Sequence, residues 1–229
     1  MKAESTSEYL NRHTPRLAAV VRLARGLLNR EERILDVGPH YLTTCLQQIG
    51  HPVDTLGFWV DGDAGTPELR PGCRHYEADL GQVRTYLEAG LPPRASYGLV
   101  VACCIVEHLA VAPWHWMSLF GRLTRPGGKI LVSTDNGVSL KRRLRMLAGL
   151  QPYPPLHRVP LNGDLGHVRE YTNAQLLEAG RVAGLELISH WATQGCVYPG
   201  GIGRLYGQVQ RLLPPSMRDL MYFVWRRKS

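Results

Sequence analysis

Two histidines are the side chains best suited to move a proton. His108 follows an almost wholly apolar run, 97–105, and His167 stands at the end of a proline-rich segment, 151–169. An imidazole exchanges its proton near neutral pH, so both rings are candidate general bases. For His108, a structural role at the start of a helix is the alternative.

An acid and a glycine end another apolar run. The local sequence is RILDVGP, in which Asp36 and Gly38 follow a short, buried strand. Glycine lets the backbone approach a ligand, because a Cβ would collide with it or require an unfavourable positive φ. Acids and glycines also end many strands that bind nothing, so this pair alone is a weak signal of a binding loop.

Apolar strands that alternate with helices must hold these side chains. We expect strands at 33–39, 53–61, 73–80, 97–105, 129–136, 185–193 and 217–228, and helices at 15–29, 42–50, 81–89, 113–124, 139–150 and 173–184. Continuous apolar strands indicate a parallel sheet covered on both faces. The pattern predicts an α/β fold of Rossmann-like type: a doubly wound, mostly parallel seven-stranded sheet with helices on both faces. Such sheets bind ligands at the carboxyl ends of their strands.

The composition fits one domain in a reducing compartment. With 229 residues, 44% of them hydrophobic, a single domain over 1–229 is the simplest organisation. Within it we expect a lid-like insertion at about 137–171 and a Gly/Pro-rich excursion at about 194–216. The polar N-terminus, the lack of a stretch of about 18 apolar residues and five cysteines without a CxxC pair favour a cytoplasmic protein.

Three segments resemble, in order, the motifs of one enzyme family. ILDVGPHYLT is similar to the first motif of class I S-adenosylmethionine-dependent methyltransferases, YGLVVACCIVEHL to their fourth-strand motif, and LTRPGGKILVST to their turn and fifth strand. The resemblance runs from about residue 33 to 193, most of the chain. It implies the methyltransferase fold, S-adenosylmethionine as cofactor and methyl transfer as the activity.

The resemblance also assigns cofactor contacts. Asp79 matches the acid that meets the adenine amino group, and Asp61 is the nearest substitute for the acid that holds the ribose, unless it is an exposed loop acid. His40, Trp59 and Gly98 depart from the family pattern, which means either an unusual cofactor site or a decayed one. The expected cofactor-binding residues are Asp36, Gly38, His40, Asp61, Asp79, Leu80, Ala102 and Cys103.

The methyl acceptor is expected at the loops beyond the fourth strand. Trp114, Tyr153 and Arg169 are the expected substrate-binding residues, since aromatic surfaces near an arginine suit a sugar or an anion. GHVREYTNAQLLEAGRVAGLEL resembles a segment of small-molecule methyltransferases, and the chain faintly resembles those associated with polysaccharide and glycolipid synthesis. This implies methylation, at oxygen, of a small molecule or a sugar or glycan, with His167 and His108 as catalytic residues.

Two other functions stay open. A catalytically silent methyltransferase fold that serves as a binding or partner subunit would account for the three departures. An RNA methyltransferase would suit the net charge of +8, but no RNA-binding module is visible, so a nucleic acid partner is not expected. We expect no metal, because Cys104 stands where metal-binding relatives would have an acid.

A basic helix is predicted after the fifth strand. Lys141, Arg142, Arg143 and Arg145 share the segment 139–150 with apolar residues. The favoured interpretation is a lid helix whose charges lie in water. The alternative is peripheral contact with an anionic membrane. The sequence does not indicate an oligomeric state.

Overall fold

The computed structural model describes residues 6–29, 31–58, 68–82, 91–152, 166–198 and 200–229. Its strands are β1 (Ile34–Val37), β2 (Val53–Leu56), β3 (His75–Tyr76), β4 (Tyr97–Cys103), β5 (Thr124–Asp135), β6 (Glu186–Thr193) and β7 (Leu220–Arg226). Its α-helices are α1 (Thr6–Leu27), α2 (Tyr41–Gln47), α3 (Pro113–Leu123), α4 (Leu140–Leu147), α5 (Asn173–Val182) and α6 (Gly200–Leu212). Two short 3-10 turns are η2 (Val106–His108) and η4 (Pro215–Met217).

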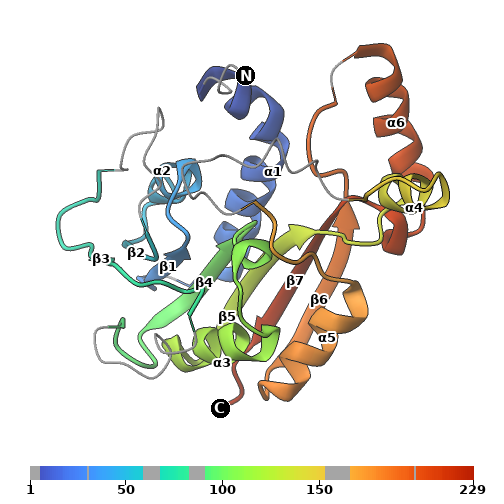
Figure 1. Cartoon of the computed structure of the whole chain (residues 1–229). Helices are drawn as coiled ribbons and strands as arrows, with labels where there is room; N and C mark the ends of the chain where they lie inside the picture. Colours follow the sequence, from blue (N-terminus) through green and yellow to red (C-terminus); the bar gives the residue numbers. More distant parts are fainter. Residues whose placement is uncertain (1–5, 30, 59–67, 83–90, 153–165, 199) are drawn as a thin grey trace.

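These strands form one sheet in the order β3-β2-β1-β4-β5-β7-β6 (Figure 1). Neighbours from β3 to β5 are parallel, whereas β7 runs antiparallel between β5 and β6. The strand order reverses between β1 and β4, and an open α/β sheet leaves a ligand crevice at such a point. The predicted doubly wound, mostly parallel seven-stranded sheet is confirmed.

Helices cover both faces of the sheet, because successive strand side chains point to opposite faces. On one face, α1 and α2 bury Val20 and Leu46 in a core that includes Leu99 of β4. On the other face, Trp116 of α3 lies in a core with Val100, the next residue of β4. Figure 1 shows α3 and α5 side by side on that face. The loops at the strand ends therefore extend from a sheet that is covered by helices on both faces.

The Gly/Pro-rich segment 194–216 contains a helix that was not predicted from the sequence, since α6 fills most of it. Gly203 and Gly207 lie where the chain approaches itself closely. A Cβ on them would stand 2.8 Å from Tyr198 and 2.9 Å from Gln194. These glycines serve helix packing, which is why composition alone misled the prediction.

The predicted strands at 53–61 and 73–80 are too long. β2 ends at Leu56, after which Gly57 adopts a φ of +125° and leads the chain out of the sheet, and β3 keeps only two residues. The turn expected within LTRPGGKILVST, at Arg125 to Gly128, lies inside β5, whose pairing with β4 shifts register near there. Elements at the sheet centre therefore match the sequence pattern better than those at its β3 edge.

Some segments for which a helix or an insertion was predicted lie outside the described residues. Most of the helix expected at 81–89 and the middle of the segment 151–169 belong to this group. Of the lid-like insertion at 137–171, the structure describes α4 and the residues from 166 onward. Among the described helices, none has both the length and the hydrophobicity to span a membrane.

Candidate active site

A cavity of about 280 Å³ opens at the carboxyl ends of β4 and β5. Its walls come from α1, the turn after β4, the end of β5, the start of α4 and the segment before α6. His108 and His167 both line it, together with Glu107 and Asp135. The fold thus brings the two histidines singled out from the sequence into one site, next to the point where the strand order reverses.

His167 is held by a carboxylate three residues further along the chain. Its Nδ1 lies 2.6 Å from Oε1 of Glu170, whose side chain is fully buried, and Arg142 donates to the same oxygen. Burial lowers the pKa of His167, but the hydrogen bond to Glu170 and the charge of Asp135 outweigh it and raise the pKa above its usual value. An acid therefore orients this imidazole through Nδ1, so that Nε2 is the nitrogen that meets a ligand.

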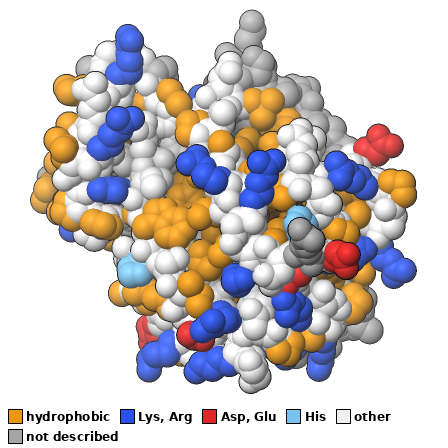
Figure 2. Space-filling model, turned by 180° about the vertical axis from the view of Figure 1, so that it is seen from behind, with side chains coloured by type: hydrophobic (Ala, Val, Ile, Leu, Met, Phe, Trp, Pro, Cys, Tyr) orange, Lys and Arg blue, Asp and Glu red, His pale blue; other side chains and the backbone are white. Residues whose placement is uncertain are grey.

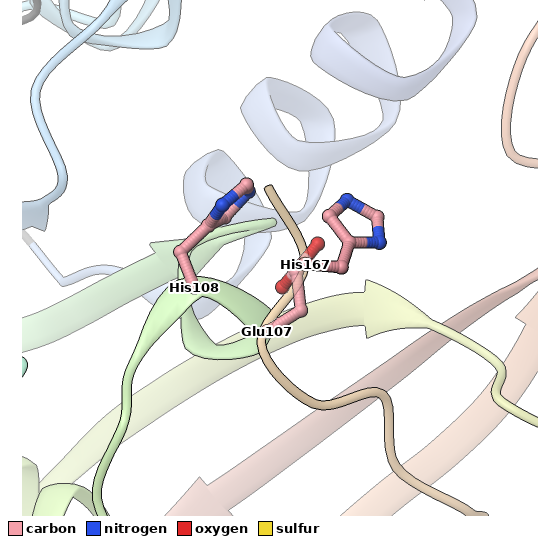
Figure 3. Close-up of side chains that lie close together, drawn as sticks. All are labelled: Glu107, His108 and His167. Atoms are coloured by element: carbon pink, nitrogen blue, oxygen red, sulfur yellow. The ribbon is translucent and has the colours of Figure 1, made fainter. Parts of the chain in front are cut away.

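Glu107 and His108 approach His167 from η2, the turn after β4 (Figure 3). The rings of His108 and His167 meet edge to face, with centroids 5.0 Å apart. Glu107 is buried and accepts a hydrogen bond from Thr134 at 2.8 Å. Burial raises the pKa of Glu107 to about 7, and the charge of Asp135 adds to the rise. Groups that exchange protons near neutral pH are gathered here, as in a general acid–base site.

The same side chains have the composition of a metal site. Ligand atoms lie within 4.8 Å of one another in two groups, Glu107 with His108 and His167, and Asp135 with His167 and Glu170. However, the buried acids already have protein partners, since Thr134 donates to Glu107 and Arg142 to Glu170. The expectation that no metal is required stays a prediction.

Asp36 is the next-to-last residue of β1 and is almost fully buried. Thr43 of α2 donates to its Oδ2 at 2.6 Å, whereas no hydrogen bond from the described residues reaches its Oδ1. Burial raises the pKa of Asp36 to about 8, although the Thr43 hydrogen bond opposes the rise. A buried carboxylate oxygen without a partner is costly unless a ligand supplies a donor.

Gly38 forms the turn between β1 and α2 with a φ of +76°, which side chains disfavour. A Cβ on it would stand 2.7 Å from Cγ1 of Ile105, so the loops after β1 and β4 touch at this glycine. His40 is the N-cap of α2. Burial, and then the nearby charge of Arg16, lower the pKa of His40 to about 4, so its ring is neutral at physiological pH.

The structure describes three further residues that were expected to bind the cofactor, and they lie in different surroundings. Leu80 and Ala102 are buried in the hydrophobic core beneath this edge. Asp79 accepts from the backbone N–H of Gly81 at 2.9 Å and so shapes its own turn. Asp61 lies outside the described residues.

Cys103 and Cys104 form a thiol pair at the end of β4. Ser133 donates to the sulfur of Cys103 at 2.9 Å, and Arg16 of α1 donates to that of Cys104 at 3.2 Å. The hydrogen bond from Cys104 lowers the pKa of Cys103 to about 6. Cys104 also has a positive φ of 52°, an uncommon conformation that concentrates at functional sites.

Trp114 and Arg169 do not line the cavity that holds His167. They line a second cavity of about 390 Å³ between the start of α3 and α5. The Arg169 guanidinium there lies 5.6 Å from the centre of the Tyr171 ring. The structure thus separates these two expected substrate residues from the candidate bases. The third, Tyr153, lies outside the described residues.

Sequence analysis missed three residues of the site: Asp135, Arg142 and Glu170. Two of them carry a signal in hindsight, because Asp135 ends an apolar strand and Glu170 follows His167 by three residues. Arg142 carries none. It was expected to lie in water with its basic neighbours, but it is only 6% exposed and turns inward to Glu170.

Comparison with known proteins gives the fold. No family model matches the chain, and no curated protein sequence does. A solved S-adenosylmethionine-dependent methyltransferase from Mesorhizobium loti is 14% identical over 93% of this chain and 96% of its own, with a TM-score of 0.56. One from Archaeoglobus fulgidus is 12% identical over 93% of each chain, with a TM-score of 0.58. The chain has the fold of the S-adenosylmethionine-dependent methyltransferases.

A third methyltransferase structure contains bound ligands. The 1,6-didemethyltoxoflavin-N1-methyltransferase of Burkholderia thailandensis is 14% identical over 93% of this chain and 77% of its own, with a TM-score of 0.55. It was solved with 1,6-didemethyltoxoflavin and S-adenosylhomocysteine.

One departure from the methyltransferase pattern, Gly98, has a local structural cause. A Cβ on Gly98 would stand 2.6 Å from the side chain of Glu32, which forms an ion pair with Arg125. Glycine is therefore needed there for packing. His40 starts α2, and its backbone N–H donates to Oγ1 of Thr43 at 3.2 Å. The third departure, Trp59, lies outside the described residues.

Proposed function

We propose that this protein is an S-adenosylmethionine-dependent methyltransferase that methylates an oxygen of a small molecule or of a sugar or glycan. The observation that carries the proposal is the His167–Glu170 pair, which lines a cavity at the strand ends of a methyltransferase fold. The bound S-adenosylhomocysteine in the Burkholderia relative supports the same cofactor here. A cytoplasmic location is part of the proposal, and the five free cysteines support it.

The residues at the β1 end fit the cofactor. Asp36 offers a buried oxygen without a protein donor, which the ammonium group of a methionine moiety can satisfy. Gly38 leaves room for backbone approach, because it carries no Cβ at the contact with the β4 loop. S-adenosylmethionine, when bound, supplies an electrophilic methyl group. The remaining task of the protein is to place the acceptor and to remove its proton.

His167 is suited to take that proton. Its Nδ1–H donates to Glu170, which leaves the lone pair of Nε2 to accept a proton from an acceptor hydroxyl. Arg142 forms an ion pair with Glu170 and so holds this carboxylate in its buried position beside His167. His108 packs against the His167 ring and lines the same cavity, so we propose that it contacts the acceptor as well.

A silent methyltransferase fold is the second candidate, and cofactor binding separates the two. We expect S-adenosylhomocysteine to bind the purified protein in titration calorimetry and to raise its melting temperature. Failure of S-adenosylhomocysteine and S-adenosylmethionine to bind the folded protein would support the silent subunit and contradict the enzyme.

Asp36→Asn is expected to stabilise the ligand-free protein and to weaken S-adenosylhomocysteine binding. The pKa of Asp36 is raised from 3.8 to about 8, so the folded protein retains a proton that the unfolded chain releases above about pH 4. The wild type therefore loses stability as pH rises from about 4 to about 8. Asparagine keeps an acceptor for Thr43 without this cost.

Melting curves and calorimetry test both effects of Asp36→Asn. The melting temperature of the variant should exceed that of the wild type by a margin that widens from pH 5 to pH 8. The affinity for S-adenosylhomocysteine should fall about tenfold or more, the value of a hydrogen bond to a charged group. Unchanged affinity in the folded variant would remove Asp36 from the cofactor site.

The pH profile of turnover is expected to report the ionisation of His167. Activity needs the neutral ring, so kcat should rise with pH through an apparent pKa above about 6.5. Removing the Glu170 carboxylate destabilises the imidazolium, so Glu170→Gln should move this limb to lower pH. Asp135→Asn should shift the limb in the same direction by less, since Asp135 lies 3.8 Å from the ring. A limb that neither variant moves would contradict the assignment.

A further inference from the structure

Helices α4 and α6 lie beside one another at one side of the molecule (Figure 1). The hydroxyl of Tyr206 in α6 lies close to the backbone of Lys141 in α4. The Lys141 ammonium lies 5.5 Å from the centre of the ring of Tyr198, just before α6. Tyr198 and Tyr206 both donate to Asp219. These contacts tie the two helices into one unit.

Each of the two helices presents leucines and basic residues together on its outside. In α6, the exposed pair Arg204 and Leu205 is followed seven residues later by the exposed pair Arg211 and Leu212, which places all four on one helix face. In α4, the exposed residues include Arg143, Leu144, Met146 and Leu147. Leu147 and Leu212 are 84% and 87% exposed, more than any other large hydrophobic residue described. Figure 2 shows basic and hydrophobic side chains mixed over the upper-left lobe, where α6 lies in this view.

The charge of this face selects its partner. Neither α4 (LKRRLRML) nor α6 (GGIGRLYGQVQRL) contains an acid. A second copy of the chain would set like charges against one another, which is unfavourable. An anionic bilayer suits both the leucines and the arginines of this face. The leucines insert between headgroups and acyl chains, while the arginines bind lipid phosphates.

We propose that the α4/α6 face docks on the surface of an anionic lipid bilayer. This face consists of Arg143, Leu144, Arg145, Met146, Leu147, Arg204, Leu205, Arg211 and Leu212. It extends the possibility raised from the basic segment of α4 in two ways. Arg142 is excluded, since it points inward, and α6 supplies four of the nine residues.

The docking face adjoins the candidate active site. Ser139 and Lys141, where α4 begins, line the cavity, and so do Cys196 and Tyr198, just before α6. A protein docked through these helices therefore holds the cavity close to the lipid headgroups. The acceptor is then the hydroxylated polar head of a membrane lipid, a statement that rests on the proposed function.

Vesicle flotation tests the docking directly. The full chain is mixed with vesicles of phosphatidylcholine containing phosphatidylglycerol, or of phosphatidylcholine alone, at low and at physiological salt. We expect the protein to float with the anionic vesicles only, and less so as salt rises. Changing Arg143, Arg145, Arg204 and Arg211 together to glutamine should weaken binding by about a hundredfold or more.

A leucine variant and a matched control test whether the leucines of the face contribute and whether the position of the arginines matters. Replacing Leu144, Leu147, Leu205 and Leu212 by glutamine should reduce flotation even at low salt. The matched control changes Arg22, Arg25, Arg70 and Arg74 to glutamine, with the same loss of charge at exposed positions outside α4 and α6. This control should bind like the wild type, and melting curves establish that each variant is folded. Equal loss in the control and the arginine variant would reduce the effect to net charge and overturn the proposal.

Other outcomes separate the docking from the enzyme. A wild type that fails to float at low salt overturns the docking, as does a dimer in light scattering that the leucine variant converts to a monomer. All three variants should bind S-adenosylhomocysteine like the wild type, because none of their positions lines the cavity. Flotation without S-adenosylhomocysteine binding would contradict the proposed function and leave the docking standing.

Discussion

His167→Ala is expected to lower kcat by about two to four orders of magnitude, the usual contribution of a general base. The affinity for S-adenosylhomocysteine should stay close to that of the wild type, because His167 lines the cavity that we propose for the acceptor, whereas Asp36 and Gly38 do not line it. Release of S-adenosylhomocysteine measures turnover, with the acceptor that works best in a panel of hydroxylated sugars and glycolipids. Calorimetry measures cofactor affinity.

His190→Ala is the matched control for this loss. His190 is exposed on β6, where its ring stacks on Phe223 of β7, outside the cavity. Its removal should leave kcat unchanged. Wild-type turnover in His167→Ala would remove this residue from the catalytic step, whereas an equal loss in both variants would point to a general defect in folding.

Gly38→Val is expected to abolish measurable binding of S-adenosylhomocysteine. Its Cβ would collide with Ile105 at 2.7 Å, and its β-branched side chain would stand at a φ of +76°. A strained backbone of this kind costs on the order of 1–3 kcal/mol, and relieving the collision requires the β1 and β4 loops to separate. Both loops belong to the cofactor site that we propose.

Gly72→Val separates the collision from the backbone strain. Gly72 has a φ of +81°, and no described atom would lie within 4 Å of its Cβ. Valine there should lower the melting temperature slightly and leave S-adenosylhomocysteine affinity unchanged. Wild-type affinity in a folded Gly38→Val protein would contradict the placement of the cofactor at this loop.

The central strands could be predicted from the sequence because each contains a continuous apolar run. β4 is buried along almost its whole length and β5 is buried from Ile130 to Thr134, so these runs leave little ambiguity. The helix α6 was missed because Gly203 and Gly207 look like loop residues until the close contacts they permit are known. A glycine that serves packing and one that serves a turn are identical in sequence.

The sequence predicted individual residues of the candidate site but not the contacts between them. His167 was identified by its residue type and its place at the end of the proline-rich segment. Arg142, which pairs with Glu170, lies 28 residues from it in sequence and belongs to another element. Periodicity does not encode such a contact. Trp114 and Arg169 were chosen by residue type as well, and the structure places them in a different cavity from the candidate bases.

Arg142 gives α4 two functional sides. Its guanidinium reaches inward to Glu170, which fixes the His167 ring, while the leucines and arginines of the same helix point outward. We therefore expect a shift of α4 against the sheet to move the guanidinium and to change the proton affinity of His167. Because such coupling is reciprocal, an occupied active site also changes how firmly the helix holds its outer position. Through Arg142, α4 would then couple the outer surface of the protein to the candidate active site.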